Sequence, residues 1–224
     1  MAIQNKVTIS EKDVSGYMQQ RDNGEHLKIK SPSEYQDDIM SYFSDDVKGG
    51  IELPFVKTQE DFRIRMGELT IVSGYSGHGK TAWLSYCMLH LLKNHKTLIA
   101  SFISKIEHKL YLYDAEGETS TSKVLEVVYY AAEKLNVKMI VIDSLMKCGV
   151  NEDDLNGQKS FANKLAVAAR DLKIHIFLVA HSRKTADENG SPSKFDVAGS
   201  ANITNLADNS LSVHRNKKKS SYDG

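Results

Sequence analysis

The sequence predicts an α/β protein whose mainly parallel β-sheet is covered by helices on both faces. Short, continuous apolar runs alternate along the chain with longer segments in which apolar residues recur at helical spacing. Such runs are typical of parallel strands buried on both faces, and their alternation with helices is typical of doubly covered sheets. With 224 residues, the chain is long enough for one such domain and an additional arm.

The individual elements follow from these patterns in order along the chain. Apolar runs predict strands at residues 68–73, 97–103, 109–114, 138–143 and 174–180. Helical spacing of apolar residues predicts helices at residues 81–92, 122–135 and 156–172. No internal repeat is visible. The main domain is therefore placed at residues 51–219, followed by a tail at residues 220–224.

Residues 1–50 are polar and differ in character from the rest of the chain. One amphipathic helix is predicted at residues 33–43, with Ser33 as its N-cap. The segment has too few apolar residues for a core of its own. Two interpretations stay open: an arm or linker that packs on something else, such as a neighbouring subunit, and a flexible tail with one transient helix.

The composition sets limits on the class of protein. Lys plus Arg and Asp plus Glu both number 29, so the net charge does not indicate a nucleic-acid partner. The only two cysteines, Cys87 and Cys148, lack metal-ligand spacing, which is the usage of a reducing compartment. No signal-peptide core is visible, and no apolar run approaches the roughly 18 residues of a membrane helix. We expect a soluble cytoplasmic protein without a membrane partner.

One stretch matches the phosphate-binding loop (P-loop) pattern G-x-x-x-x-G-K-[ST], with the residues Gly74, Tyr75, Ser76, Gly77, His78, Gly79, Lys80 and Thr81. A predicted strand precedes it and a predicted helix follows it. Glycines let backbone N–H groups turn inward around an anion, and the helix N-terminus adds partial positive charge. Lys80 is expected to contact the β- and γ-phosphates, and the Thr81 hydroxyl to bind Mg²⁺. The stretch predicts a site for ATP or another NTP; a glycine-rich turn with a surface lysine is the alternative.

A second part of this site is predicted at the end of a later strand. Asp143 follows four apolar residues, downstream of the P-loop. P-loop enzymes carry at this place the acid that holds Mg²⁺. The alternative is an aspartate that only caps the next turn.

Several separated stretches resemble a known family in the right order. They are residues 62–71 (FRIRMGELTI), 141–148 (VIDSLMKC), 178–184 (LVAHSRK), and 196–203 (DVAGSANI) with 205–208 and 215–216. They resemble DnaB-type replicative helicases, most of all bacteriophage primase–helicases and Twinkle-like enzymes, over about residues 30–219. The resemblance implies a RecA-like P-loop NTPase core, in which the polar residue at His181 senses the γ-phosphate. A surface histidine is the alternative for His181.

The same resemblance implies a function and partners. It implies a ring-shaped homo-oligomer of six subunits that translocates on single-stranded DNA during DNA replication. Primase and other replication proteins would be further partners, and the location would be the cytoplasm of a bacterial or phage-infected cell. The candidate DNA-contacting residues lie after the strand at 174–180 and are Arg183, Lys184, Gly199, Ser200 and Asn202. Composition alone does not suggest DNA.

Two departures from the family bear on catalysis. The family ends its second strand with Ser-x-Glu-Met, whose Glu activates water, but Ile103 stands at that place here. A block of several tens of residues is missing between Ile103 and Lys105, and Glu107 is a candidate substitute base, with an exposed turn residue as the alternative. No residue clearly replaces the family's arginine finger, for which Arg215 is a candidate only by proximity.

Three functions therefore stay open at this point. The first is an ATP-dependent DNA helicase motor domain. The second is an ATP-binding module with impaired hydrolysis that acts as an assembly partner. The third is another RecA-like ATPase such as a recombinase, although the recombinase polymerisation motif is not found.

Overall fold

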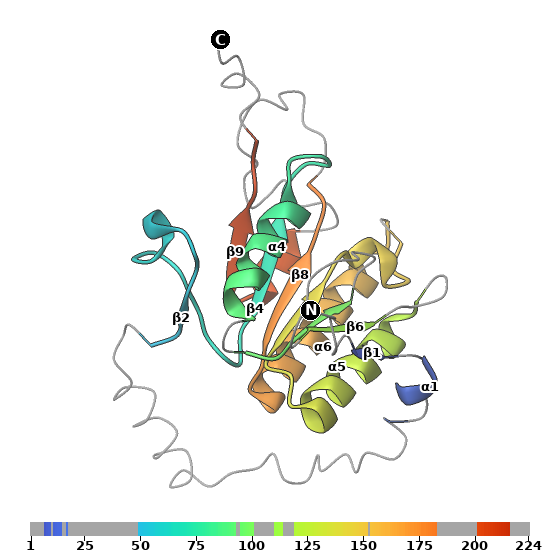
Figure 1. Cartoon of the computed structure of the whole chain (residues 1–224). Coiled ribbons are helices and arrows are strands. Elements are labelled where there is room, and N and C mark those ends of the chain that lie inside the picture. Colours follow the sequence, from blue (N-terminus) through green and yellow to red (C-terminus); the bar gives the residue numbers. More distant parts are fainter. Residues whose placement is uncertain are drawn as a thin grey trace, which may run out of the picture.

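The computed structural model describes residues 7–9, 11–14, 17, 49–92, 95–100, 110–113, 119–151, 153–182 and 201–215. The described part is organised around one seven-stranded sheet in which all paired neighbours are parallel (Figure 1). In spatial order the strands are β1 (Val7–Ile9), β6 (Leu110–Tyr113), β5 (Thr97–Ala100), β7 (Met139–Ile142), β8 (His175–Val179), β4 (Leu69–Ser73) and β9 (Asn209–Ser212).

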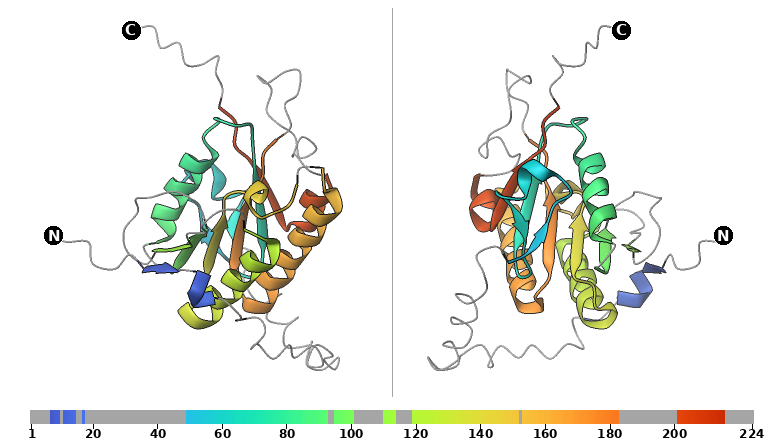
Figure 2. Two further views of the ribbon diagram at one scale, coloured as in Figure 1. Left: turned by 90° about the vertical axis from the view of Figure 1, so that its right-hand side faces the viewer. Right: turned by 60° about the vertical axis from the view of Figure 1, so that its left-hand side comes forward.

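Helices cover both faces of this sheet, as the sequence predicts (Figure 2). Helix α4 (Lys80–Leu91) lies on one face, and α5 (Thr121–Leu135) and α6 (Leu155–Leu172) lie on the other. The short helices α1 (Glu11–Val14) and α7 (Ala201–Leu206) pack near α5 and α6, respectively. A separate antiparallel pair, β2 (Ile51–Glu52) and β3 (Arg63–Ile64), flanks the short turn η2 (Val56–Thr58).

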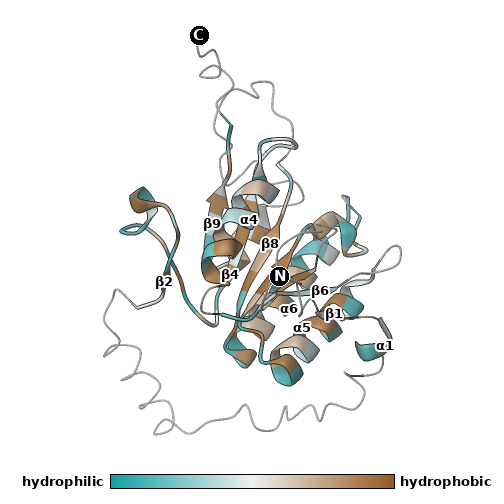
Figure 3. Cartoon of the chain, in the orientation of Figure 1, coloured by the Kyte–Doolittle hydropathy of each residue, from teal (hydrophilic) through white to brown (hydrophobic). Residues whose placement is uncertain are grey.

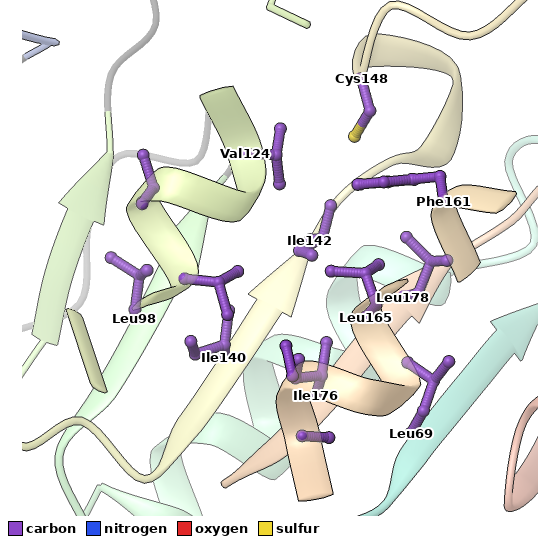
Figure 4. Packing of buried hydrophobic residues seen from close by; sticks show 14 of the residues in the cluster. Leu69, Leu98, Val124, Ile140, Ile142, Cys148, Phe161, Leu165, Ile176 and Leu178 are labelled. Atoms are coloured by element: carbon purple, nitrogen blue, oxygen red, sulfur yellow. The ribbon is translucent and has the colours of Figure 1, made fainter. Parts of the chain in front are cut away.

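The strands feed two hydrophobic clusters because successive side chains point to opposite faces. In β7, Ile140 and Ile142 belong to the cluster under α5 and α6, whereas Met139 and Val141 belong to the cluster under α4. All four are buried. Figure 4 shows the first cluster, where side chains from the strands meet Leu165 of α6. In Figure 3 the apolar colour follows the central strands, and polar colour marks the outer sides of the covering helices.

Both long helices begin at a residue with a side-chain cap. The Ser120 hydroxyl accepts a hydrogen bond from the Lys123 N–H at 3.2 Å, and the Asp154 carboxylate accepts one from the Gly157 N–H at 2.8 Å. Such caps satisfy N–H groups that have no partner within the helix. They explain why α5 and α6 begin one residue before the predicted helices.

The structure differs from the sequence prediction mainly at the edges of the sheet. Within the expected arm at residues 1–50, β1 pairs with β6 of the same chain, and Ile9 and Val14 are buried in the cluster under α5 and α6. A three-residue edge strand has too little apolar pattern to be recognised alone, but it is stabilised by its neighbour. The predicted helix at residues 33–43 lies outside the described residues. The strands β2, β3 and β9 are further elements that the sequence analysis does not predict.

Within the described ranges, no helix is long and apolar enough to span a membrane.

Candidate functional site

The P-loop connects a central strand to the helix that covers one face of the sheet. Strand β4 ends at Ser73, and α4 begins at Lys80. Gly79, the N-cap of α4, has φ +91° and offers no side-chain cap. The first N–H groups of α4 are therefore not capped by a side chain of that residue, and the positive end of the helix faces the loop.

Gly74 lies between the ends of two other strands. Its carbonyl accepts a hydrogen bond from the Ser182 N–H at 3.1 Å, and the preceding Ser73 carbonyl accepts one from the Val213 N–H at 2.8 Å. A Cβ atom at Gly74 would collide with the Val213 carbonyl oxygen. Glycine at this position allows the P-loop to pass between the chain segments that follow β8 and β9.

Lys80 is folded back onto its own loop. Its Nζ lies 2.7 Å from the Gly74 carbonyl oxygen and 3.1 Å from that of Tyr75, and only 6% of the residue is exposed. Burial lowers the pKa of Lys80 from its usual value, while the negative charge of Asp143 acts in the opposite direction. The lysine thus donates to acceptors that phosphate oxygens can replace.

Thr81 and Asp143 meet beside the lysine. The Thr81 hydroxyl donates a hydrogen bond to Oδ2 of Asp143 at 3.0 Å, although the residues are 62 positions apart. Thr81 is exposed and Asp143 is partly exposed, so the pair is accessible from outside the fold. The structure therefore brings together the two residues that the sequence analysis assigns to Mg²⁺.

His181 is the fourth predicted residue at the same place. Its Nδ1 lies 3.4 Å from Nζ of Lys80. The register of the sheet explains this convergence, because Val72 of β4 pairs with Val179 of β8, and Ile142 of β7 pairs with Leu178. The carboxyl ends of three parallel strands therefore lie at one edge, and the residues that follow them meet there.

Comparisons with known proteins agree with this arrangement. No family model matches the chain. The Twinkle homolog protein, chloroplastic/mitochondrial, of Arabidopsis thaliana is 21% identical over 245 residues, which cover 85% of this chain and 34% of that protein. The chain thus spans about a third of the length of this relative. Among solved structures, the ATPase domain of a DnaB-like helicase has 13% sequence identity and a TM-score of 0.70, and the match covers 87% of this chain and 88% of that one.

The fold is that of a RecA-like ATPase domain. The predicted fold class is confirmed, and so is the resemblance to DnaB-type and Twinkle-like helicase ATPase domains. Since 85% of 224 residues is fewer than 245, the aligned part of the Twinkle homolog contains residues without a counterpart in this chain.

The oxygen donors of this RecA-like domain fit a magnesium ion with a bound triphosphate. Mg²⁺ is a hard cation that takes oxygen ligands and keeps several waters, with one or two carboxylates and substrate phosphates completing its shell. The hydroxyl of Thr81 and the carboxylate of Asp143 are such ligands, and their direct hydrogen bond shows that one small ion can reach both. The glycine loop and Lys80 would hold the phosphates beside them.

Other predicted site residues of the RecA-like domain lie outside the described residues, namely Glu107, Arg183, Lys184, Gly199 and Ser200. Asn202 lies in α7, but its side chain is not among those described. The neighbouring Ile203 is fully buried in the cluster under α5 and α6. The catalytic base and the DNA-contacting residues therefore stay predictions.

The structure also adds residues to the site that the sequence analysis does not assign to it. The Arg215 N–H donates a hydrogen bond at 3.3 Å to Nδ1 of His78 in the P-loop, across 137 positions of sequence. His214 lies against the same imidazole. Only the pairing of β9 with β4 brings these residues together, and no local pattern in the sequence signals it.

Proposed function

We propose that this chain is the motor domain of an ATP-dependent DNA helicase, which couples NTP hydrolysis to translocation on single-stranded DNA during replication. One observation carries the proposal: the Thr81 hydroxyl and the Asp143 carboxylate lie 3.0 Å apart beside the P-loop lysine. This is the arrangement that P-loop NTPases use to hold Mg²⁺ with a nucleoside triphosphate.

Each residue then has a defined role in binding. Lys80 exchanges the Gly74 and Tyr75 carbonyls for oxygens of the β- and γ-phosphates. Thr81 ligates Mg²⁺ directly, and Asp143 holds it through water. His181, which already contacts Nζ of Lys80, senses the γ-phosphate.

Resemblance to Twinkle-like and DnaB-type enzymes supports the DNA and ring parts of the proposal. Ligands of open parallel sheets bind outside the carboxyl ends of the strands. The chain segment that begins at Arg183 leaves β8 at that edge, next to the nucleotide site. We propose that it contacts single-stranded DNA in a ring of six subunits, with primase or other replication proteins as partners, in a bacterial or phage-infected cell.

A second candidate function is an ATP-binding module with impaired hydrolysis that acts as an assembly partner. Two observations favour it: Ile103 stands where the family carries its catalytic Glu, and the aligned Twinkle homolog contains residues that this chain lacks. Loss of a positioned general base slows water attack by roughly 10²–10⁴-fold and leaves nucleotide binding intact. In the first function, Glu107 is the candidate base.

ATP hydrolysis with and without single-stranded DNA separates the two functions. Lys80→Ala removes the phosphate-contacting ammonium, and Lys57→Ala removes an exposed lysine of η2 as a matched control. The motor function requires turnover that rises with single-stranded DNA, is abolished by Lys80→Ala and persists in Lys57→Ala. Tight Mg–ATP binding with turnover no higher than that of Lys80→Ala would refute the motor function and support the module.

A further inference from the structure

His78 occupies a position that the phosphate-binding motif leaves open to any residue. Its neighbours Ser76, Gly77 and Gly79 are exposed, but His78 is only 5% exposed. Its ring lies between two others, with centroids 5.3 Å from Tyr75 and 5.2 Å from His214. A buried imidazole at the tip of an exposed glycine loop is unexplained by phosphate binding alone.

The ring of His78 also holds a backbone group from a distant part of the chain. Its Nδ1 accepts the hydrogen bond from the Arg215 N–H at 3.3 Å. An accepting Nδ1 carries no proton, so the neutral ring has its proton on Nε2. Arg215 is exposed, and this bond fixes the place where its side chain leaves the backbone.

The path of the chain after β9 fits this contact. At the start of the strand, Asp208 is bound to β4 twice: its N–H donates to the Leu69 carbonyl at 3.0 Å, and its carboxylate accepts from the Leu69 N–H at 2.8 Å. At the end, the Val213 N–H donates to Ser73, and the Val213 carbonyl lies against Gly74. Residues 213–215 therefore run along the P-loop.

We propose that His78 is a positioning residue that fastens residues 213–215 to the P-loop and thereby holds Arg215 at the nucleotide site of its own chain. This rests on the proposed nucleotide binding. The always-charged guanidinium of Arg215 suits the anionic triphosphate, and its place depends on a hydrogen bond that only an acceptor at residue 78 can provide. His78 acts through Arg215 and does not itself contact the nucleotide.

Amide hydrogen exchange tests the fastening without any nucleotide. His78→Met removes the acceptor, whereas His78→Asn keeps one, because the Asn side-chain oxygen lies about where Nδ1 does. Exchange of the Arg215 amide is expected to be several-fold faster in His78→Met, in line with the loss of one hydrogen bond of roughly 1 kcal/mol, and close to wild type in His78→Asn. Equal protection in wild type and His78→Met would overturn the proposal. Faster exchange throughout the chain in both variants would also overturn it, because it would show a general role in stability.

Calorimetric titration with Mg–ATP tests the role of the fastening. We expect His78→Met to weaken binding in the chain with Arg215, on the order of tenfold, and to have little further effect in Arg215→Gln, because contacting residues that act as a unit are not additive. Additive losses would overturn the positioning role. Wild-type binding no tighter than that of Lys80→Ala would instead refute the proposed function, while the exchange of the Arg215 amide would still decide the fastening.

Discussion

The Thr81 hydroxyl donates its hydrogen bond to Asp143 at the carboxyl edge of the sheet, although β8 lies between the strands that lead to the two residues. Thr81 begins its side chain on the first turn of α4, and Asp143 follows β7 directly. A metal bound here would join the P-loop to a strand two places away in the sheet. Three properties of the pair and its surroundings can be measured directly, and a fourth concerns the helix that covers them.

Removing either oxygen ligand should reduce the contribution of Mg²⁺ to nucleotide binding. Thr81→Val and Asp143→Asn keep the shape of each side chain but remove the hydroxyl or the negative charge. We expect the Mg²⁺-dependent gain in ATP affinity to fall roughly 10- to 100-fold, the range seen when the surroundings of a metal lose one conserved partner. Titrations with and without Mg²⁺ measure this gain. Ser85→Ala, which removes a hydroxyl that donates to the Thr81 carbonyl, should leave it unchanged.

Acid should destabilise the fold through His175. Nδ1 of this buried histidine donates to the Arg65 carbonyl at 2.7 Å, and Nε2 accepts from the Thr70 hydroxyl at 3.0 Å. Burial lowers the pKa of His175 to about 4. Because the unfolded chain binds a proton near pH 6.5 and the folded chain does not, stability is fully present above that pH and falls as the pH drops toward 4. The linked change is about 3 kcal/mol.

Urea unfolding at several pH values between 7.5 and 4 measures this change. Other carboxylates and histidines titrate in the same range, so the wild type is compared with His175→Gln, which cannot gain the proton. The free energy of unfolding of the variant should be lower at pH 7.5 and should depend less on pH. Identical slopes for both chains would show that His175 does not contribute.

The two cysteines should be inert in the folded protein. Cys87 and Cys148 are buried free thiols, and burial raises the pKa of each to about 12. Since the thiolate is the reactive form, its fraction near pH 8 falls by about a thousandfold relative to a thiol of normal pKa. A chromogenic disulfide reagent should react slowly with the native chain and rapidly with two thiols in urea. Rapid reaction of the native chain would contradict the burial of these residues.

Asp154 should stabilise α6 as its N-cap. Its carboxylate accepts from the Gly157 N–H at 2.8 Å, so Asp154→Ala leaves that N–H without its partner. We expect a loss of about 1 kcal/mol in the free energy of unfolding. Asp153→Ala removes a neighbouring exposed carboxylate as a control and should change the free energy of unfolding by much less.

Most of the interior could be predicted because its pattern is local. Strands β4, β7 and β8 are apolar on both faces, so every residue of each run is buried. The edge strands lack this pattern: in β9, Leu211 is half-buried between exposed serines. Such a strand is stabilised by pairing with β4, which its own sequence does not encode. For the same reason the contact of Arg215 with His78 could not be predicted.

The sequence by itself determined the P-loop and the α/β class. Glycine spacing and apolar periodicity act through neighbouring residues, so they can be recognised without knowledge of the rest of the chain. Only the tertiary structure decided which distant residues join the loop. The parallel register of β7, β8 and β4 brings Asp143 and His181 to Lys80, and the pairing of β9 brings Arg215 to His78. These contacts depend on packing between residues up to 141 positions apart in sequence, for which local preference carries no information.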